Sequence, residues 1–204
     1  MSPGATFERV YTELRRMLAE GELPPGSPIE PAAVGRQIAS SITPVRDALH
    51  RLTGERLVEA PNHNGFRVPL ITEAELRDLY QWHAQLLILA ARQIRPSQAA
   101  VEATGPSLGE EPASAMTTLF GWIADASGNL EHVHAVHVLS DRLAAFRRIE
   151  PAVLGDLAGE LQAFRDLYRS GAAAKLVAAL DRYSRRRLRA VPALLAARHG
   201  RRHV

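Results

Sequence analysis

The sequence predicts a mainly α-helical protein with an N-terminal domain at residues 1–70 and an all-helical bundle at residues 71–204. In the first domain, three helical segments precede a short alternating pattern that predicts a small β-hairpin. In the second domain, apolar residues recur at helical spacing almost throughout. The chain has 204 residues, 46% of them hydrophobic, which is enough for one or two domains with a sizeable core.

The first domain begins with a helix at residues 6–20, whose apolar residues fall on one stripe. Two glycines and three prolines at 21–30 predict a rigid turn. A short helix is expected at 31–38 and a third helix at 42–54. Because only three residues separate these two and the third has a polar outward face, they predict a helix-turn-helix.

The third helix organises the domain, and its start is marked by Ser41, Thr43 and Pro44. Its apolar face follows the spacing i, i+3, i+4, i+7 and comprises Val45, Ala48, Leu49 and Leu52. The opposite face carries Thr43, Arg46, Asp47 and His50. A hydroxyl, a guanidinium and an imidazole on the outward side of a short helix suit contacts with base edges and phosphates. The alternative is an ordinary amphipathic surface helix.

A β-hairpin is expected next, because residues 56–60 and 65–70 alternate like strands and Asn64-Gly65 favours a tight turn. Three helices followed by a hairpin make a winged helix-turn-helix. The segment from Val10 to Pro69 resembles the DNA-binding domain of GntR-type transcription regulators. It carries the turn GELPPGSPI, the helix SITPVRDALHRL, the strand ERLVEA and the wing NGFRV in uninterrupted order.

The resemblance implies double-stranded DNA as a partner. A homodimer on a palindromic site is expected because one such helix covers only a few base pairs and two-fold symmetry doubles that, while the helical domain supplies enough apolar stripes to make the dimer. The helix and the wing tip then supply the expected DNA contacts: Ser41, Ile42, Thr43, Arg46, His50, His63, Asn64 and Gly65. Ile42 departs from the family pattern, which has an arginine that reads a guanine at this position. Isoleucine can only pack, for instance on a thymine methyl. The alternative for His63 is a solvated turn residue.

The second domain begins with a long helix from about Thr72 to Ile94, with His83 on its apolar face as a core histidine or a ligand. Residues 96–112 predict a flexible loop, because they are rich in proline, glycine and serine. Further helices are expected at about 113–127, 129–149, 151–170 and 172–198, with Pro192 kinking or ending the last.

This half resembles the FCD-like effector domain of the FadR subfamily, in the stretches LRDLYQWHAQLLILAARQI, LFGWIADASGN and ELQAFRDLYRSGAAAKLVAAL. The family's metal-binding aspartate and histidines fall on Thr117, Gly121, Leu161 and either Arg182 or Tyr183. We therefore expect a reduced effector domain that holds no metal at these positions and uses no cofactor. The candidate effector pocket comprises His83, Thr117, Gly121, Leu161 and Tyr183.

The segment HVHAVH at 132–137 invites a metal site. Helical spacing puts His132 on the apolar stripe, whereas His134, His137 and Asp141 can converge on the other side, where two imidazoles and a carboxylate suit zinc. The alternatives are a polar helix face or a dimer contact.

Charge and composition limit the function classes. Residues 1–70 hold eight arginines and eight acids, whereas residues 182–204 hold eight arginines and no acid. The chain has no cysteine, no apolar run of membrane-spanning length and no secretion signal, so we expect a cytoplasmic protein without membrane contact.

No nucleophile–base arrangement is visible, so we do not expect an enzyme. The sequence favours a DNA-binding transcription regulator whose helical domain senses a small-molecule effector. One alternative is a regulator whose helical domain only dimerises or binds a protein partner. A remote one is a metal-dependent hydrolase built on His134, His137 and Asp141.

Overall fold

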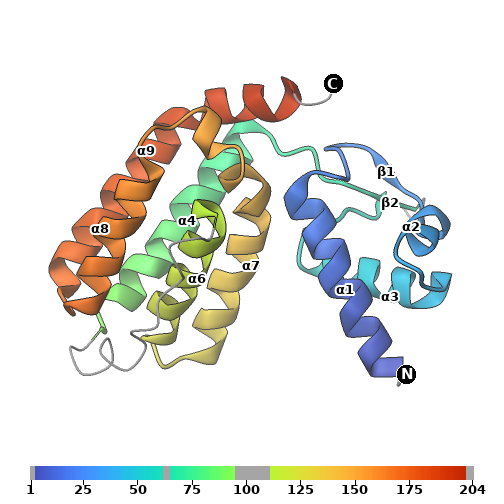
Figure 1. Cartoon of the computed structure of the whole chain (residues 1–204), viewed down its shortest axis with the longest axis horizontal. Coiled ribbons are helices and arrows are strands. Elements are labelled where there is room, and N and C mark those ends of the chain that lie inside the picture. The colour runs from blue at the N-terminus through green and yellow to red at the C-terminus, as the bar shows by residue number, and fades with distance from the viewer. Residues whose placement is uncertain (1–2, 62–64, 95–110, 201–204) are drawn as a thin grey trace. The chain divides into compact units, whose positions relative to one another are not determined.

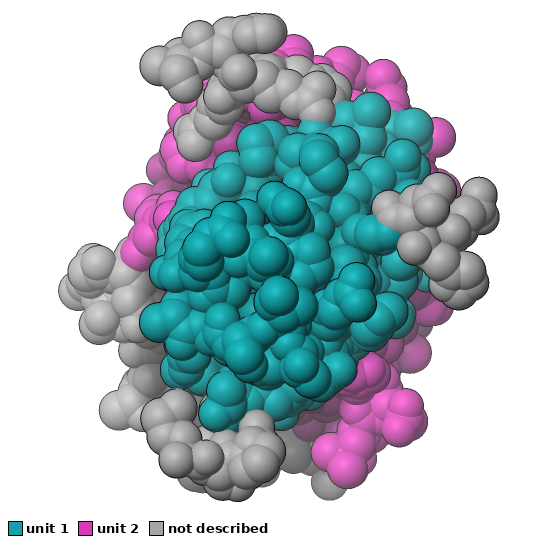
Figure 2. Space-filling view, turned by 90° about the vertical axis from the view of Figure 1, so that its right-hand side faces the viewer, with its two compact units in different colours: residues 1–72 teal, residues 73–204 magenta. Residues whose placement is uncertain are grey.

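The computed structural model describes residues 3–61, 65–94 and 111–200. The chain forms two compact units, residues 1–72 and residues 73–204, which Figure 1 draws as ribbons and Figure 2 colours teal and magenta. The mainly helical fold class expected from the sequence is confirmed. Within the described ranges, no helix is both long enough and apolar enough to cross a membrane.

The first unit packs three helices against a small sheet. Its elements are α1 (Pro3–Glu20), β1 (Pro28–Ile29), α2 (Pro31–Gln37), α3 (Ile42–Gly54) and β2 (Phe66–Arg67). Both α1 and α2 pack against α3. The core collects the apolar stripes of the helices and the inward residues of the strands, among them Val10, Leu14, Val45, Leu49, Leu52, Val58, Phe66 and Val68.

Two left-handed residues end the first two helices. After α1, Gly21 has φ +77°, and the amide of Glu22 donates to the carbonyl of Met17 at 3.0 Å. After α2, Ala39 has φ +50°, and the amide of Ser40 donates to the carbonyl of Gly35 at 2.8 Å. Both ends therefore use the same hydrogen bond, in which the amide of the residue after the left-handed one donates to the carbonyl five residues earlier. The second one makes the tight turn between α2 and α3.

The small sheet differs from the expectation for residues 21–30. Strand β1 pairs antiparallel with β2, with Pro28 opposite Arg67 and Ile29 opposite Phe66. The sequence predicted only a turn here, since two residues that include a proline carry no strand pattern. The expected hairpin is present as one bridge, in which Glu59 and Arg67 exchange two backbone hydrogen bonds of 2.9 Å.

The second unit is a helical bundle of α4 (Glu73–Ala91), α6 (Pro112–Asp125), α7 (Leu130–Arg147), α8 (Leu157–Arg169) and α9 (Ala173–Gly200), with a short 3-10 turn, η2 (Glu150–Ala152). Helix α4 packs against α9, α7 and α6, and α8 packs against α6 and α9. The loop expected at 96–112 lies almost entirely outside the described residues.

One expectation for the bundle needs correction, and one of its two alternatives is decided. The helix expected at 151–170 is divided into η2 and α8, because Asp156 caps α8 by accepting a hydrogen bond from the amide of Gly159 at 3.2 Å. Pro192 was expected to kink or end the last helix, and it does not end it, since α9 continues through it to Gly200. Figure 1 shows the C-terminal part of α9 running in a different direction from the rest, as a proline kink would produce.

Candidate nucleic-acid interface and helical interior

Helix α3 divides into one buried and one exposed face. Val45, Ala48, Leu49 and Leu52 are each fully buried. The side chains expected to contact DNA lie on the exposed face: Ser41, Ile42, Thr43, Arg46 and His50. Because the apolar face anchors the helix without using these residues, they are available to a partner.

The N-terminal end of α3 is suited to an anionic partner. Ser41 is the N-cap residue, and its hydroxyl makes no capping hydrogen bond. The amides of the first helical turn have no acceptor within the helix and carry partial positive charge. Ile42 begins the helix and leaves half of its side chain (50%) exposed. In helix-turn-helix proteins, this end of the recognition helix approaches the base edges.

Helix α1 holds the turn before α3 through Arg9, a residue that the sequence did not single out. The Arg9 guanidinium donates to the carbonyl oxygens of Ile38 and Ala39 at 2.9 and 3.2 Å. These carbonyls belong to the end of α2, where the helix offers no partner of its own. Arg9 therefore ties α1 to the turn that sets the direction of α3.

A second link joins α1 to the C-terminal end of α3. The Tyr11 hydroxyl lies 2.7 and 2.8 Å from the two carboxylate oxygens of Glu55. The Arg51 guanidinium lies over the Tyr11 ring, 4.2 Å from its centroid. Burial and the hydrogen bond to Glu55 raise the pKa of Tyr11 to about 12, so the phenol stays protonated at pH 7.

The wing is described in part. Gly65 has φ +85°, which favours glycine at the end of the hairpin tip. His63 and Asn64, two of the expected contacts, lie outside the described residues. His50 reaches the wing from α3, with its ring edge-on to Phe66 at a centroid distance of 5.0 Å. His50 therefore packs against β2 as well as lying on the exposed face.

In the second unit, buried polar side chains meet around Arg147, which is 2% exposed. Its guanidinium donates to the Thr117 hydroxyl at 3.1 Å and to the Ser140 carbonyl at 3.2 Å, and lies 3.4 Å from Nε2 of His83. Beside this group, the buried Arg187 pairs with Glu150 at 2.8 Å. The sequence placed no role on Arg147, although it follows Ser140 and Leu143 on the inward stripe of α7.

His83 is a core histidine with a hydrogen-bond partner. It is 1% exposed, and its Nε2 lies 2.9 Å from the Ser140 hydroxyl. Burial, and then the Arg147 guanidinium, hold the pKa of His83 well below its usual range. The imidazole is therefore neutral at pH 7.

The positions at which the expected resemblance of the helical unit would place metal ligands carry side chains that do not suit a cation. The Thr117 hydroxyl accepts a hydrogen bond from a guanidinium. The Leu161 side chain has no atom that can bind a metal ion. A methyl group added to Gly121 would lie 3.3 Å from the His137 ring, so this glycine faces α7. Tyr183 packs edge-on against Phe120 and Phe164. Of the expected pocket, the structure brings His83, Thr117 and Tyr183 around Arg147 and Phe120, and directs Gly121 elsewhere.

The second proposed metal set is not assembled either. In the part of the chain that the structure describes, no three histidines or carboxylates come together as metal ligands, and this includes His134, His137 and Asp141. His137 instead packs on Gly121. His132 lies on the inward stripe as expected and has its Nε2 2.9 Å from the Leu86 carbonyl.

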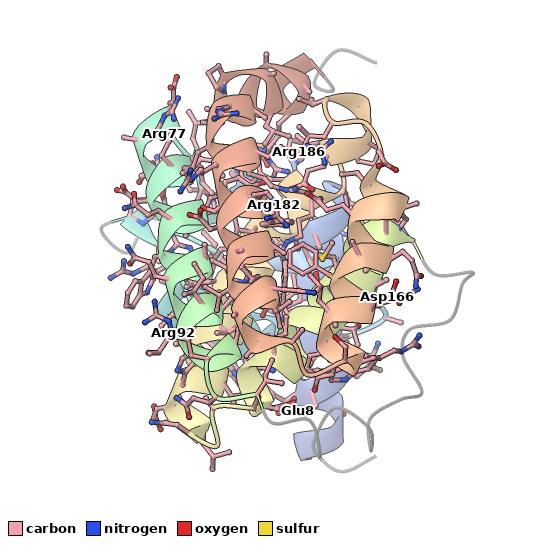
Figure 3. The ribbon with its side chains drawn as sticks, turned by 90° about the vertical axis from the view of Figure 1, so that its left-hand side faces the viewer. Glu8, Arg77, Arg92, Asp166, Arg182 and Arg186 are labelled. Atoms are coloured by element: carbon pink, nitrogen blue, oxygen red, sulfur yellow. The ribbon has the colours of Figure 1, made fainter. Side chains whose placement is uncertain are left out.

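Among the described residues, a small cavity and a larger groove lie near the polar interior. The one between Met116, Arg147 and Glu150 holds about 10 Å³, the space for one water molecule. The other is a groove of about 210 Å³ between α8 and α9, with Phe164, Leu167 and Tyr183 in its lining. Arg182 and Arg186 extend from α9 beside this groove (Figure 3).

Residues 6–68 match the family model described as bacterial regulatory proteins, gntR family. The N-terminal unit is a GntR-family domain. The matched segment covers α1 to β2 and thus includes the turn, the recognition helix and the wing described above.

Relatives of known sequence match only part of the chain. The chain is 30% identical over 76 residues to the Escherichia coli transcriptional repressor GlaR, which covers 37% of this chain and 34% of that protein. It is 25% identical over 92 residues to YdhC of Bacillus subtilis, an uncharacterised HTH-type transcriptional regulator, covering 45% of this chain and 41% of YdhC. The chain thus matches well under half the length of these relatives.

The fold likeness extends over nearly the whole chain. The Escherichia coli protein McbR/YncC superposes with a TM-score of 0.72, covering 91% of this chain and 96% of that one, at 16% identity. At this identity the likeness concerns the fold. It shows that a solved structure shares this fold over nearly its whole length.

Proposed function

We propose that this protein is a GntR-type transcription regulator that binds double-stranded DNA as a homodimer, with α3 in the major groove and the wing beside it. The observation that supports this most directly is the exposed face of α3. It presents Thr43 and Arg46 beside Ile42, whereas the opposite face is fully buried. Such a regulator would work in the cytoplasm, where bacterial DNA lies.

Selection of bound fragments from random double-stranded DNA tests the proposal. One recognition helix covers only a few base pairs, so a homodimer should select two inverted half-sites, with centres one helical turn or a multiple of it apart. No enriched sequence would contradict the DNA-binding function. Enrichment of a single half-site would contradict the homodimer but leave DNA binding intact.

The role of Arg46 is tested with Arg46→Ala on the selected site. We expect a loss of about 1–3 kcal/mol of binding free energy per half-site, because one base or phosphate contact is removed. The matched control is Arg16→Ala, which removes the same charge from α1, where Arg16 pairs with Glu13 and Glu22. Unchanged affinity in Arg46→Ala, or an equal loss in both variants, would contradict the assignment.

We further propose that the helical unit is a reduced, FCD-like effector domain of the FadR subfamily that senses a small molecule. The interior around Arg147 is filled, so the groove between α8 and α9 is the better location for a ligand. Its apolar lining and Arg182 suit a small carboxylate with an apolar body.

A panel of aliphatic and aromatic carboxylates tests this by thermal shift and by its effect on affinity for the selected DNA. Arg182→Gln should abolish the response. The control Arg185→Gln should retain it, since Arg185 pairs with Asp181 on the same helix at 2.7 Å and does not line the groove. If no carboxylate changes either property, the second candidate is favoured. In that candidate, the helical unit only dimerises or binds a protein partner, which the filled interior also supports.

A further inference from the structure

The outward face of α4 carries two large apolar side chains that the bundle leaves uncovered. Trp82 is 52% exposed and Leu89 is 49% exposed, although both lie on a helix whose other face is deeply buried. They are seven residues apart and so lie in one line along the helix. Exposed tryptophan and leucine in register are typical of an interface rather than of a solvated surface.

The exposed residues in line with these two form a regular seam. Asp78, Trp82, Gln85, Leu89 and Arg92 follow one another at alternating spacings of four and three residues, and all are exposed. This is the repeat by which one helix contacts another along a single seam. We refer to these five residues as the α4 seam. Arg92 lies just past the helix end, and its amide still donates to the Ile88 carbonyl at 3.3 Å. Figure 3 shows Arg92 near one end of α4.

The charges of the α4 seam are arranged for a second copy of itself. Asp78 and Arg92 both lie seven residues from Gln85, in opposite directions, which is about 10 Å along the helix axis. If two α4 helices cross antiparallel with Gln85 at the two-fold axis, Asp78 of each copy comes to the level of Arg92 of the other. A parallel pair would instead place Asp78 against Asp78 and Arg92 against Arg92.

Within the described ranges, neither charge has a partner in its own chain. Among the described residues, no ion-pair or hydrogen-bond partner is assigned to Asp78 or Arg92, whereas their neighbour Arg77 pairs with Glu73 at 2.8 Å and donates to the Leu188 carbonyl. In a self-complementary interface, each contact occurs twice, so both charges on both copies find partners. The Gln85 side chains at the axis can exchange amide hydrogen bonds, and a single polar residue in an apolar seam fixes its register.

We infer that the α4 seam is the contact through which two copies of this chain pair, with the α4 helices antiparallel and related by a two-fold axis at Gln85. The inference rests on the proposed homodimer and names its surface. It also requires that Trp82 and Leu89 of both copies become buried when the dimer forms.

Single-cysteine crosslinking tests the geometry, because the chain has no cysteine of its own. Gln85→Cys in the full chain should form a disulfide-linked dimer under mild oxidation, since the two sulfurs meet at the axis. The matched control is Gln162→Cys, at an exposed position on α8, which should remain monomeric on denaturing gels under the same conditions. A protein with the mass of a dimer but no crosslink at Gln85 would overturn the inference while leaving the homodimer intact.

Charge reversal tests the pairing independently. Asp78→Arg and Arg92→Asp should each raise the dimer dissociation constant by about tenfold or more in sedimentation equilibrium. Each variant places two like charges opposite one another at residues 78 and 92, and the two-fold axis repeats this repulsion. The double variant Asp78→Arg/Arg92→Asp should restore the wild-type constant. Circular dichroism checks that each variant keeps its helix content. A wild-type monomer at about 100 µM, or a double variant no better than the single ones, would overturn the proposed seam.

Discussion

Gly35 on α2 lies directly against the backbone of Ser40 in the turn before α3. A methyl group built on Gly35 would come within 2.8 Å of the Ser40 carbonyl oxygen, a backbone atom that cannot move without shifting the turn. The same two residues are joined by the 2.8 Å hydrogen bond from the Ser40 amide to the Gly35 carbonyl. The direction of the recognition helix therefore depends on the absence of a side chain at residue 35.

We predict that Gly35→Ala destabilises the protein and weakens DNA binding. In a helix interior, replacing glycine with alanine normally stabilises a protein by about 1 kcal/mol. Here we expect the replacement to lower the free energy of unfolding instead. The steric overlap should cost about 1–3 kcal/mol, measured by urea denaturation. Ala39→Gly provides the contrast. It relieves a left-handed alanine at φ +50° and should be neutral or stabilising by up to roughly 1 kcal/mol. A stabilised Gly35→Ala variant would contradict this account of the turn.

We predict that Ile42→Arg changes sequence preference. Ile42 is half exposed at the first position of α3. In the family that this segment resembles, an arginine at this position reads a guanine. The arginine variant should gain about 1–3 kcal/mol on an operator with guanine at the matching base pair. Ile42→Ala should not shift preference toward guanine, and repeated selection with all three proteins measures the change. If the wild type already selects guanine there and Ile42→Arg alters nothing, the register of α3 on DNA is wrong.

We predict that the hydrogen bond between Tyr11 and Glu55 makes stability fall at high pH. The pKa of Tyr11 is about 12 in the folded protein, against about 10 for an unfolded chain. The folded state therefore retains a proton that the unfolded state loses, so this contribution is complete below pH 10 and disappears as the pH rises toward 12. The pKa values of the buried Tyr80 and Tyr183 are also raised and add to the wild-type trend. The informative quantity is the difference in unfolding free energy between wild type and Tyr11→Phe from pH 8 to 11.5, which should shrink as the pH rises. A constant difference would contradict the assignment.

We predict acid sensitivity through His83. Its pKa is held well below the usual range in the folded protein, whereas in the unfolded chain it is about 6.5. The unfolded state therefore binds a proton that the folded state does not, and stability falls as the pH drops below 6.5. His83→Gln keeps a polar group for Ser140 but cannot titrate. Its unfolding free energy should decline less than that of wild type between pH 7 and 5, and parallel curves would exclude this role for His83.

The recognition helix was the most predictable part of the fold because its signals are local. Ser41 and Pro44 mark its start, and the apolar spacing from Val45 to Leu52 defines its buried face. The structure places the helix at Ile42–Gly54, the range expected from the sequence. The stripe of α1 and the inward position of His132 on α7 were predictable for the same reason, since each depends only on the 3.6-residue period.

Strand β1 was not predictable, because two residues form a strand only when partners 37 and 39 residues later supply the hydrogen bonds. The interior of the bundle was likewise decided by tertiary structure. Thr117, His83 and Arg147 lie on three different helices, and only packing shows that a guanidinium fills the space where a ligand pocket was expected. Tertiary structure also decided against a metal site at His134, His137 and Asp141. Helical spacing allows these residues to share one side of the helix, but among the described residues the fold does not bring them together as metal ligands.

The sequence alone thus determined which residues form the recognition helix and which of them face outward, because helix boundaries and periodicity are set within a few neighbouring residues. Only the tertiary structure decided what meets those faces. It placed Arg9 on the turn before α3 and a guanidinium in the helical interior, and it left Trp82 and Leu89 uncovered on α4. The physical reason is that contacts between distant segments depend on how side-chain volumes fill a shared core, and no local pattern in the chain encodes that.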